Sequence, residues 1–205
     1  MQEISIFDSK FSINATQSYD LSVQFGLSGY AYAIFDTAAL KYVALKYQPI
    51  SWTTANAYQK TLEEFLKKDA FIGKKYNRIF FTFEGRKATL VPNKFFDEND
   101  LKSYIEFNFS NTETAEVHSQ AIQVTESKLI FAVPSEITNS IAQVISTPLE
   151  FNHFAKCFIT SNLKLPYAYA VSISLHDNYF YLTVAQAGKL LIFNSYTFRD
   201  DNDLV

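Results

Sequence analysis

The sequence predicts an α/β fold, and three observations support this class. Short apolar strand patterns alternate with amphipathic helix patterns along the chain. A strand–turn–strand–turn–strand pattern occurs twice, with its two starts about 150 residues apart. Hydrophobic residues make up 48% of the chain and charged residues 19%, a balance that is typical of globular domains and excludes an intrinsically disordered chain.

The first of the two patterns predicts a three-stranded antiparallel meander. Residues 21–25 alternate between apolar and polar, residues 30–36 are apolar on both faces, and residues 42–48 read as the third strand. A strand that is apolar on both faces is typical of a sheet that is covered on both sides. Residues 1–17 are polar and aperiodic, so a loose lead-in is expected there.

The middle of the chain alternates between helix and strand patterns. Residues 54–70 predict an amphipathic helix whose apolar stripe contains Leu62, Phe65 and Leu66. Asp97 is placed to cap a later helix. The other expected elements are strands at 78–83, 88–91, 117–124 and 128–133, and helices at 97–107, 135–147 and 151–163.

The opening pattern returns near the end of the chain. Strands are expected at residues 170–175, 179–184 and 190–194, and the first two are separated by His176-Asp177-Asn178. Asp and Asn tolerate the backbone angles that tight hairpin turns require. The repeat therefore lies in the pattern of strands. The tail at residues 199–205 is expected to be disordered.

Four segments carry a resemblance to a known family. They are Arg86-Lys-Ala-Thr-Leu-Val-Pro-Asn-Lys-Phe-Phe, Lys128-Leu-Ile-Phe-Ala-Val-Pro-Ser-Glu, Glu150-Phe-Asn-His-Phe and Leu190-Leu-Ile-Phe-Asn-Ser-Tyr-Thr-Phe. Together they resemble an uncharacterised Bacteroidetes family, the domain of unknown function numbered 3822. Two meanders separated by helix and strand units resemble the actin-like ATPase fold, in which two ribonuclease H-like lobes surround a nucleotide.

The resemblance implies a division of the chain into lobes. A ribonuclease H-like first lobe, with a mixed sheet, flanking helices and inserted elements, is expected over residues 18–165. The three-stranded opening meander of a second lobe is expected over residues 166–198. A complete second lobe would need about 60 further residues at ordinary element lengths, so the chain is expected to be truncated in this lobe.

The resemblance also implies where a nucleotide would bind, namely at the first meander turn. That site needs an Asp for Mg²⁺, small residues that let backbone N–H groups reach phosphate, and a hydroxyl. Gly26, Ser28 and Gly29 are weak vestigial candidates for this phosphate loop, but Gln24 stands at the Asp position. The second turn, residues 174–178, has no glycine. We therefore expect no cofactor, with ATP and Mg²⁺ as the alternative.

The sequence predicts no catalytic and no metal-binding residue. His118, His153 and His176 lack partners at metal-site spacing, and His153 is expected to pack or to cap a helix. Cys157 has apolar neighbours, so we expect it to be buried.

Charge and composition limit the classes of partner. The net charge is −3, and no basic run is interleaved with aromatic residues, so a nucleic-acid partner is not expected. The absence of a long apolar run and of a signal-peptide pattern favours a cytoplasmic protein without a membrane partner. Tyr179, Tyr181 and Phe193 lie on the incomplete second sheet, and we expect them to form a contact surface for a protein partner or a second copy.

Three functions are consistent with these patterns. The first is a non-catalytic interaction or scaffold protein with a degenerate actin-like frame. The alternative is a nucleotide-binding regulator or weak ATPase that uses an atypical phosphate loop. A hydrolase on a ribonuclease H-like core ranks last, because it needs several clustered carboxylates and the strands offer little besides Asp36.

Overall fold

The computed structural model describes residues 2–26, 29–49, 55–145, 148–176 and 178–204. These residues form two compact units. Unit 1 contains residues 1–84 and 135–152, and unit 2 contains residues 85–134 and 153–205. Both units combine helices with sheets, so the α/β class predicted from the sequence is confirmed.

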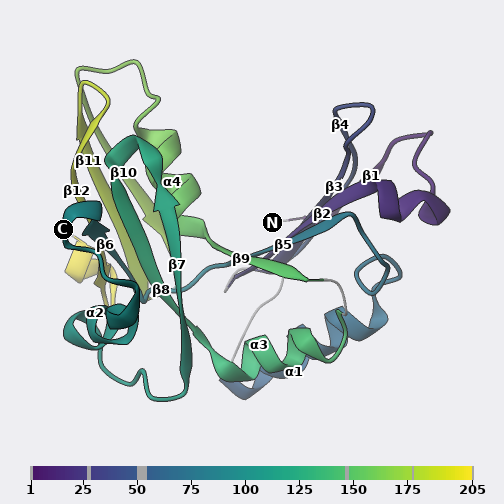
Figure 1. Cartoon of the computed structure of the whole chain (residues 1–205), viewed down its shortest axis with the longest axis horizontal. Coiled ribbons are helices and arrows are strands. Elements are labelled where there is room, and N and C mark those ends of the chain that lie inside the picture. The colour runs from purple at the N-terminus through teal and green to yellow at the C-terminus, as the bar shows by residue number, and fades with distance from the viewer. Residues whose placement is uncertain (1, 27–28, 50–54, 146–147, 177, 205) are drawn as a thin grey trace. The chain divides into compact units, whose positions relative to one another are not determined.

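Unit 1 is built on a six-stranded mixed sheet with the order β1-β4-β3-β2-β5-β9 (Figure 1). Its strands are β1 (Ile4–Phe7), β2 (Tyr19–Gly26), β3 (Gly29–Asp36), β4 (Lys41–Pro49), β5 (Arg78–Phe83) and β9 (Leu149–His153). Strands β2, β3 and β4 pair antiparallel in chain order, which confirms the first predicted meander. Strand β5 pairs parallel with β2 and so makes the sheet mixed.

Helix α1 (Ala55–Lys68) covers one face of this meander. The phenyl ring of Phe65 stacks on Tyr30, with 3.5 Å between ring centroids, and lies 6.4 Å from the ring of Phe25. Helix α3 (Ser135–Ala142) runs beside α1 (Figure 1). The side chains buried in this layer include Leu21, Val23, Phe25, Ile34, Leu62, Phe65 and Leu66.

An ion pair between a buried Asp20 and an exposed Arg78 joins the two parallel strands of unit 1. Asp20 lies on β2 directly opposite Arg78 on β5, and its carboxylate accepts hydrogen bonds from the Arg78 guanidinium at 2.6 and 3.1 Å. The Asn77 amide donates a further bond at 2.8 Å. Burial raises the pKa of Asp20, but the bonds from Arg78 and Asn77 outweigh burial and hold the pKa below its usual value. The pair therefore links β2 and β5 at two residues that are direct partners in their register.

Unit 2 contains two three-stranded antiparallel sheets with the orders β6-β8-β7 and β10-β11-β12. The first sheet consists of β6 (Ala88–Pro92), β7 (Ala115–Ile122) and β8 (Ser127–Pro134). Helix α2 (Leu101–Asn108) packs on it through Ile105, which forms a buried cluster with Val91 and Ile130. Asp97 accepts a hydrogen bond from the backbone N–H of Asn99 at 2.9 Å and caps the 3₁₀ helix at residues 98–100 that leads into α2, whereas the N-cap of α2 itself is Asp100.

The second sheet of unit 2 is the predicted second meander. It consists of β10 (Tyr169–Leu175), β11 (Tyr179–Gln186) and β12 (Lys189–Thr197), and helix α4 (Phe154–Asn162) packs on it. The Asn162 amide donates to the Thr183 hydroxyl at 2.6 Å and accepts from the Ser172 hydroxyl at 2.6 Å. These bonds hold α4 on the face of the sheet that carries Ser172 and Thr183.

Three predicted segments differ from the structure. Within the expected loose lead-in, residues 4–7 form β1, which pairs with the edge of β4, and residues 13–18 form a 3₁₀ helix. The helix expected at residues 151–163 begins only at Phe154, because residues 149–153 pair with β5 as the edge strand β9 and this pairing outweighs a weak helical pattern. In the expected disordered tail, residues 201–204 form a 3₁₀ helix. The predicted lobe boundary at residue 165 stays a prediction.

His153 joins the N-terminus of α4 to the core of unit 2. Its fully buried ring accepts a hydrogen bond at Nδ1 from the backbone N–H of Ala155 at 3.1 Å, so its capping role is confirmed. This bond leaves the ring proton on Nε2, which donates to the carbonyl of Gly85 at 2.9 Å. The Tyr181 hydroxyl donates to the same carbonyl. Burial lowers the pKa of His153 from 6.5 to about 3, so the ring is neutral in the folded protein.

The neutral state of His153 predicts an acid-dependent stability. Between its unfolded pKa of 6.5 and its folded pKa of about 3, the unfolded chain binds a proton that the folded chain excludes. The free energy of unfolding should therefore fall as the pH falls through this window, by about 1.4 kcal/mol per pH unit from this residue. Urea unfolding followed by circular dichroism at a series of pH values measures this slope.

His153→Asn tests the assignment, because Asn keeps a capping oxygen and does not titrate. The variant should be less stable at neutral pH, since it loses the bond to Gly85 and the packing on Phe131. Its stability should depend on pH less steeply than that of the wild type below pH 6.5. An unchanged slope would show that His153 is not the group responsible.

Candidate functional site

The first meander turn is the place where the sequence located a vestigial phosphate loop. Strand β2 ends at Gly26 and β3 begins at Gly29, and these two glycines are direct partners in the antiparallel pairing. Ser28, the third predicted residue, lies outside the described residues. The structure thus brings two of the three candidates together at the carboxyl end of β2, where α/β sheets usually bind their ligands.

Gly26 is a glycine because the carboxyl group of Glu84 occupies the space beside it. A Cβ atom at Gly26 would overlap Glu84 Oε2, and Glu84 directly follows β5. The Gln24 amide donates to the same oxygen at 3.4 Å, and only 6% of Glu84 is exposed. Gln24 therefore holds this carboxylate in place, where an ATPase of this fold would need a magnesium-binding Asp. Glu84 is not among the site residues predicted from the sequence, because it is far from the turn along the chain.

Gly29 has a different structural reason to be glycine. Its φ of +144° lies in a region that residues with a side chain rarely adopt. A Cβ atom there would also overlap the carbonyl oxygen of Gln48 on the neighbouring strand β4. Close backbone pairing and carboxylate packing therefore account for both glycines without a bound phosphate.

An acidic side chain lies beside the first meander turn. The Glu84 carboxylate lies at the joint end of β2 and β5, which pair in parallel up to Phe25 and Phe83. A phosphate loop needs backbone N–H groups or cations at this place. Among the described residues, no three His, Cys, Asp or Glu side chains come together as a metal site.

The second meander turn is filled by packed rings. The imidazole of His176 stacks on the ring of Tyr179 at 4.5 Å between centroids, and its Nε2 lies 3.2 Å from the Ser174 hydroxyl. The backbone N–H of His176 donates to the backbone carbonyl of Tyr179 at 2.9 Å, which closes the hairpin. Asp177 lies outside the described residues. The described residues of this turn close the hairpin and pack against the core.

The remaining candidates from the sequence are His118 and Cys157. Burial lowers the pKa of His118, an effect that Glu116 opposes, and the ring of His118 stacks on Phe131. Cys157 is exposed, so the prediction that it is buried is wrong. Helix α4 turns Ala155, Ile159 and Asn162 toward the core and leaves Cys157 on its solvent side.

Within the described part of the chain, no helix combines the length and apolar character that a membrane crossing requires.

The aromatic contact surface predicted from the sequence is not at the surface. Tyr181 is 0% exposed and Tyr179 is 2% exposed, because both lie on the face of the sheet that α4 covers. Phe193 is partly buried, and its ring stacks on that of Tyr181 at 5.7 Å between centroids. Strand β11 is apolar on both faces, so the sequence pattern could not show which of them is covered.

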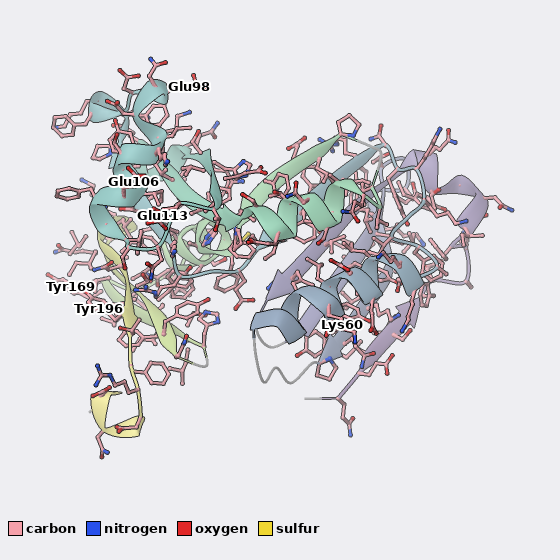
Figure 2. The ribbon with its side chains drawn as sticks, turned by 90° about the horizontal axis from the view of Figure 1, so that it is seen from below. Lys60, Glu98, Glu106, Glu113, Tyr169 and Tyr196 are labelled. Carbon is pink, nitrogen blue, oxygen red and sulfur yellow. The ribbon has the colours of Figure 1, made fainter. Side chains whose placement is uncertain are left out.

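The opposite face of the same meander is open. We call it the open face, and its exposed residues come from the two outer strands, β10 and β12, where Figure 2 labels Tyr169 and Tyr196. Exposed fractions here run from 41% for Tyr196 to 67% for Tyr169. The exposed apolar residues of this stretch are Tyr169, Val171, Ile173, Leu175, Leu191, Ile192 and Tyr196. Contiguous exposed apolar surfaces of this kind usually mark interaction sites.

Comparisons with known proteins agree with this architecture. A Bacteroides thetaiotaomicron protein with an actin-like ATPase fold and unknown function matches at a TM-score of 0.85 and 14% identity, covering 96% of this chain and 76% of that chain. A chain of the PilM–PilN type IV pilus biogenesis complex matches at a TM-score of 0.53 and 10% identity, covering 88% of this chain and 62% of that chain. No curated protein matches.

The fold and the family that the sequence resemblance implied are both confirmed. The structural matches show the actin-like ATPase fold. The family model described as "Protein of unknown function (DUF3822)" matches residues 8–205. With nearly its whole length matched, this chain belongs to that family.

Proposed function

We propose that this protein is a non-catalytic interaction or scaffold protein that keeps an actin-like frame without the chemistry of an ATPase. The observation that carries the proposal is the buried Glu84 carboxylate against Gly26 in the first meander turn. Two like unit charges 4 Å apart repel by about 4 kcal/mol at the effective dielectric of a protein surface. A phosphate group placed on this turn would meet that repulsion.

The open face supports the interaction half of the proposal. Exposure of valine, isoleucine, leucine and tyrosine side chains to water on one sheet is unfavourable. Burial of these side chains against a protein partner or a second copy would be favourable. One of the structural matches is itself a complex of two proteins, PilM and PilN, so this fold occurs in protein assemblies. We place this role in the cytoplasm, with no nucleic-acid or membrane partner.

ATP with Mg²⁺ should leave the melting temperature of this chain unchanged within about one degree. A ligand that binds only the folded state at a hundred times its Kd adds about 2.7 kcal/mol of stability, which shifts the melting temperature of a protein of this size by several degrees. Differential scanning fluorimetry with and without millimolar ATP and Mg²⁺ measures this shift. A rise of several degrees would overturn the proposal.

The alternative is a nucleotide-binding regulator or weak ATPase with an atypical phosphate loop. It is favoured by the pairing of Gly26 with Gly29 at the carboxyl end of β2 in a fold shared with ATPases. In this alternative, both glycines are needed for close approach of a ligand. In our proposal, Gly26 is needed because a side chain there would overlap Glu84, and the two hypotheses predict different stabilities for substitutions at these residues.

Gly26→Ala should lower the free energy of unfolding by about 1–3 kcal/mol, because the new methyl group displaces a buried carboxyl group. Adding Glu84→Ala should recover a large part of this loss, since the two sites are in contact and their effects are not additive. Urea unfolding of the two single variants and the double variant measures the coupling.

Gly73→Ala is the matched control for this cycle. A Cβ at Gly73 meets no atom within 4 Å, so the change should alter stability by less than about 0.5 kcal/mol. Additive effects of Gly26→Ala and Glu84→Ala would show that the carboxylate is not what keeps a glycine at residue 26.

A further inference from the structure

All three histidines of this chain, His118, His153 and His176, lie in unit 2. Two further rings connect them. The ring of Phe131 lies 5.5 Å from that of His118 and 5.0 Å from that of His153, measured between centroids. The ring of Tyr181 lies 6.2 Å from that of His153 and 5.7 Å from that of His176. We call these five rings the histidine array, and a proton on any of its histidines places a charge among packed rings.

His153 lies where α4 meets both sheets of unit 2. It begins α4 as the N-cap residue, and its backbone N–H donates to the side-chain oxygen of Gln120 on β7 at 3.1 Å. Its ring contacts Phe131 on β8 of the first sheet and Tyr181 on β11 of the second. Its Nε2 and the Tyr181 hydroxyl share the Gly85 carbonyl as their acceptor. One side chain thus joins a helix to two sheets.

A second proton on the His153 ring is incompatible with these bonds. Nδ1 is the acceptor for the backbone N–H of Ala155, so a proton added at Nδ1 would face another donor. The ring is 0% exposed, so water cannot solvate the charge where the ring lies. Protonation therefore requires the N-terminal end of α4 to leave its place beside the two sheets.

The titratable groups around the array change the response of each histidine. Burial lowers the pKa of His118, but the Glu116 carboxylate on β7 lies 3.8 Å from its Nε2 and opposes this effect. Burial lowers the pKa of His153 much further, and a charge on His176 adds to that lowering. Tyr179, which stacks on His176, carries a phenol, and phenols are already protonated at neutral pH. His153 is therefore the residue of the array that opposes protonation most strongly.

Mild acid acts on the two units unequally. Histidine is the side chain that ordinarily titrates between pH 6.5 and 5, whereas carboxylates ordinarily titrate near pH 4. Unit 1 contains no histidine, so side-chain protonation in this window falls on unit 2. The pKa of His153 is lowered by burial from 6.5 to about 3. Between about pH 7.5 and pH 5, this residue alone raises the ratio of open to closed unit 2 by about 30-fold.

We propose that unit 2 contains an acid-sensitive switch, in which protonation of His153 releases the N-terminal end of α4 from both sheets while unit 1 keeps its fold. The open state uncovers the face of the second meander that carries Tyr181. The inference goes beyond the proposed function and does not depend on it, because it concerns a proton in unit 2 and not a ligand of the first meander turn.

Hydrogen–deuterium exchange of the 205-residue chain, followed by mass spectrometry from about pH 7.5 to pH 5, tests the switch. Labelling times are scaled to the intrinsic exchange rate at each pH. Backbone amides of α4 and β11 should lose protection by about 30-fold over this range, because they exchange through the open state of unit 2. Amides of β2 and β5 in unit 1 should change by less than about threefold.

Two variants separate protonation of His153 from a general weakening of α4. His153→Asn should lower the protection of α4 at neutral pH and remove most of its dependence on pH, because Asn does not titrate. Asn162→Ala is the matched control, since it removes the bonds of α4 to Ser172 and Thr183 and no titrating group. It should lower the protection of α4 at every pH and keep the loss of about 30-fold on acidification.

An equal loss of protection in both units would overturn the switch, because acid would then unfold the whole chain at once. Protection of α4 that stays constant down to pH 5 would overturn it too, as would a pH dependence that His153→Asn retains. The comparison of the two units within the wild type needs no variant, so the test holds even if His153→Asn does not fold.

Discussion

The structure depends on one constraint of β-sheets, which is that alternate residues of every strand point to opposite faces. Each meander therefore has two faces, and each apolar face must be covered or left to water. In unit 1, α1 covers the face that carries Leu21 and Val23. The Asp20–Arg78 pair links β2 and β5 beside that layer. In unit 2, α4 covers the other face of an equivalent meander.

The same constraint decides the character of the first turn. Because β2 and β5 run parallel and in register, their carboxyl ends place Gly26 beside Glu84. An actin-like ATPase would use this position for phosphate and magnesium, and here Gln24 and Glu84 contact one another instead. The frame of the fold and the chemistry of its usual ligand are thus separable, since the frame needs only strand pairing and helix cover.

The elements of the fold were largely predictable because each one repeats its pattern locally. The strands of both meanders, α1 and the capping roles of Asp97 and His153 follow from alternation, helical spacing and side-chain chemistry. The candidate site was predictable only in part. Gly26 and Gly29 are visible in the sequence, whereas Glu84 reaches the turn only through the parallel pairing of β5 with β2.

The sequence by itself determined where the strands of both meanders lie and that the meander occurs twice, because those features are local, whereas β1 and β9 were recognised only in the structure. Only the tertiary structure decided which face of each sheet is buried. Strand β11 is apolar on both sides, so Tyr181 and Leu182 are equally suited to a core. The hydrogen bonds of Asn162 with Ser172 and Thr183 place α4 over the Tyr181 side, and contacts between residues far apart in the chain cannot be read from a local pattern.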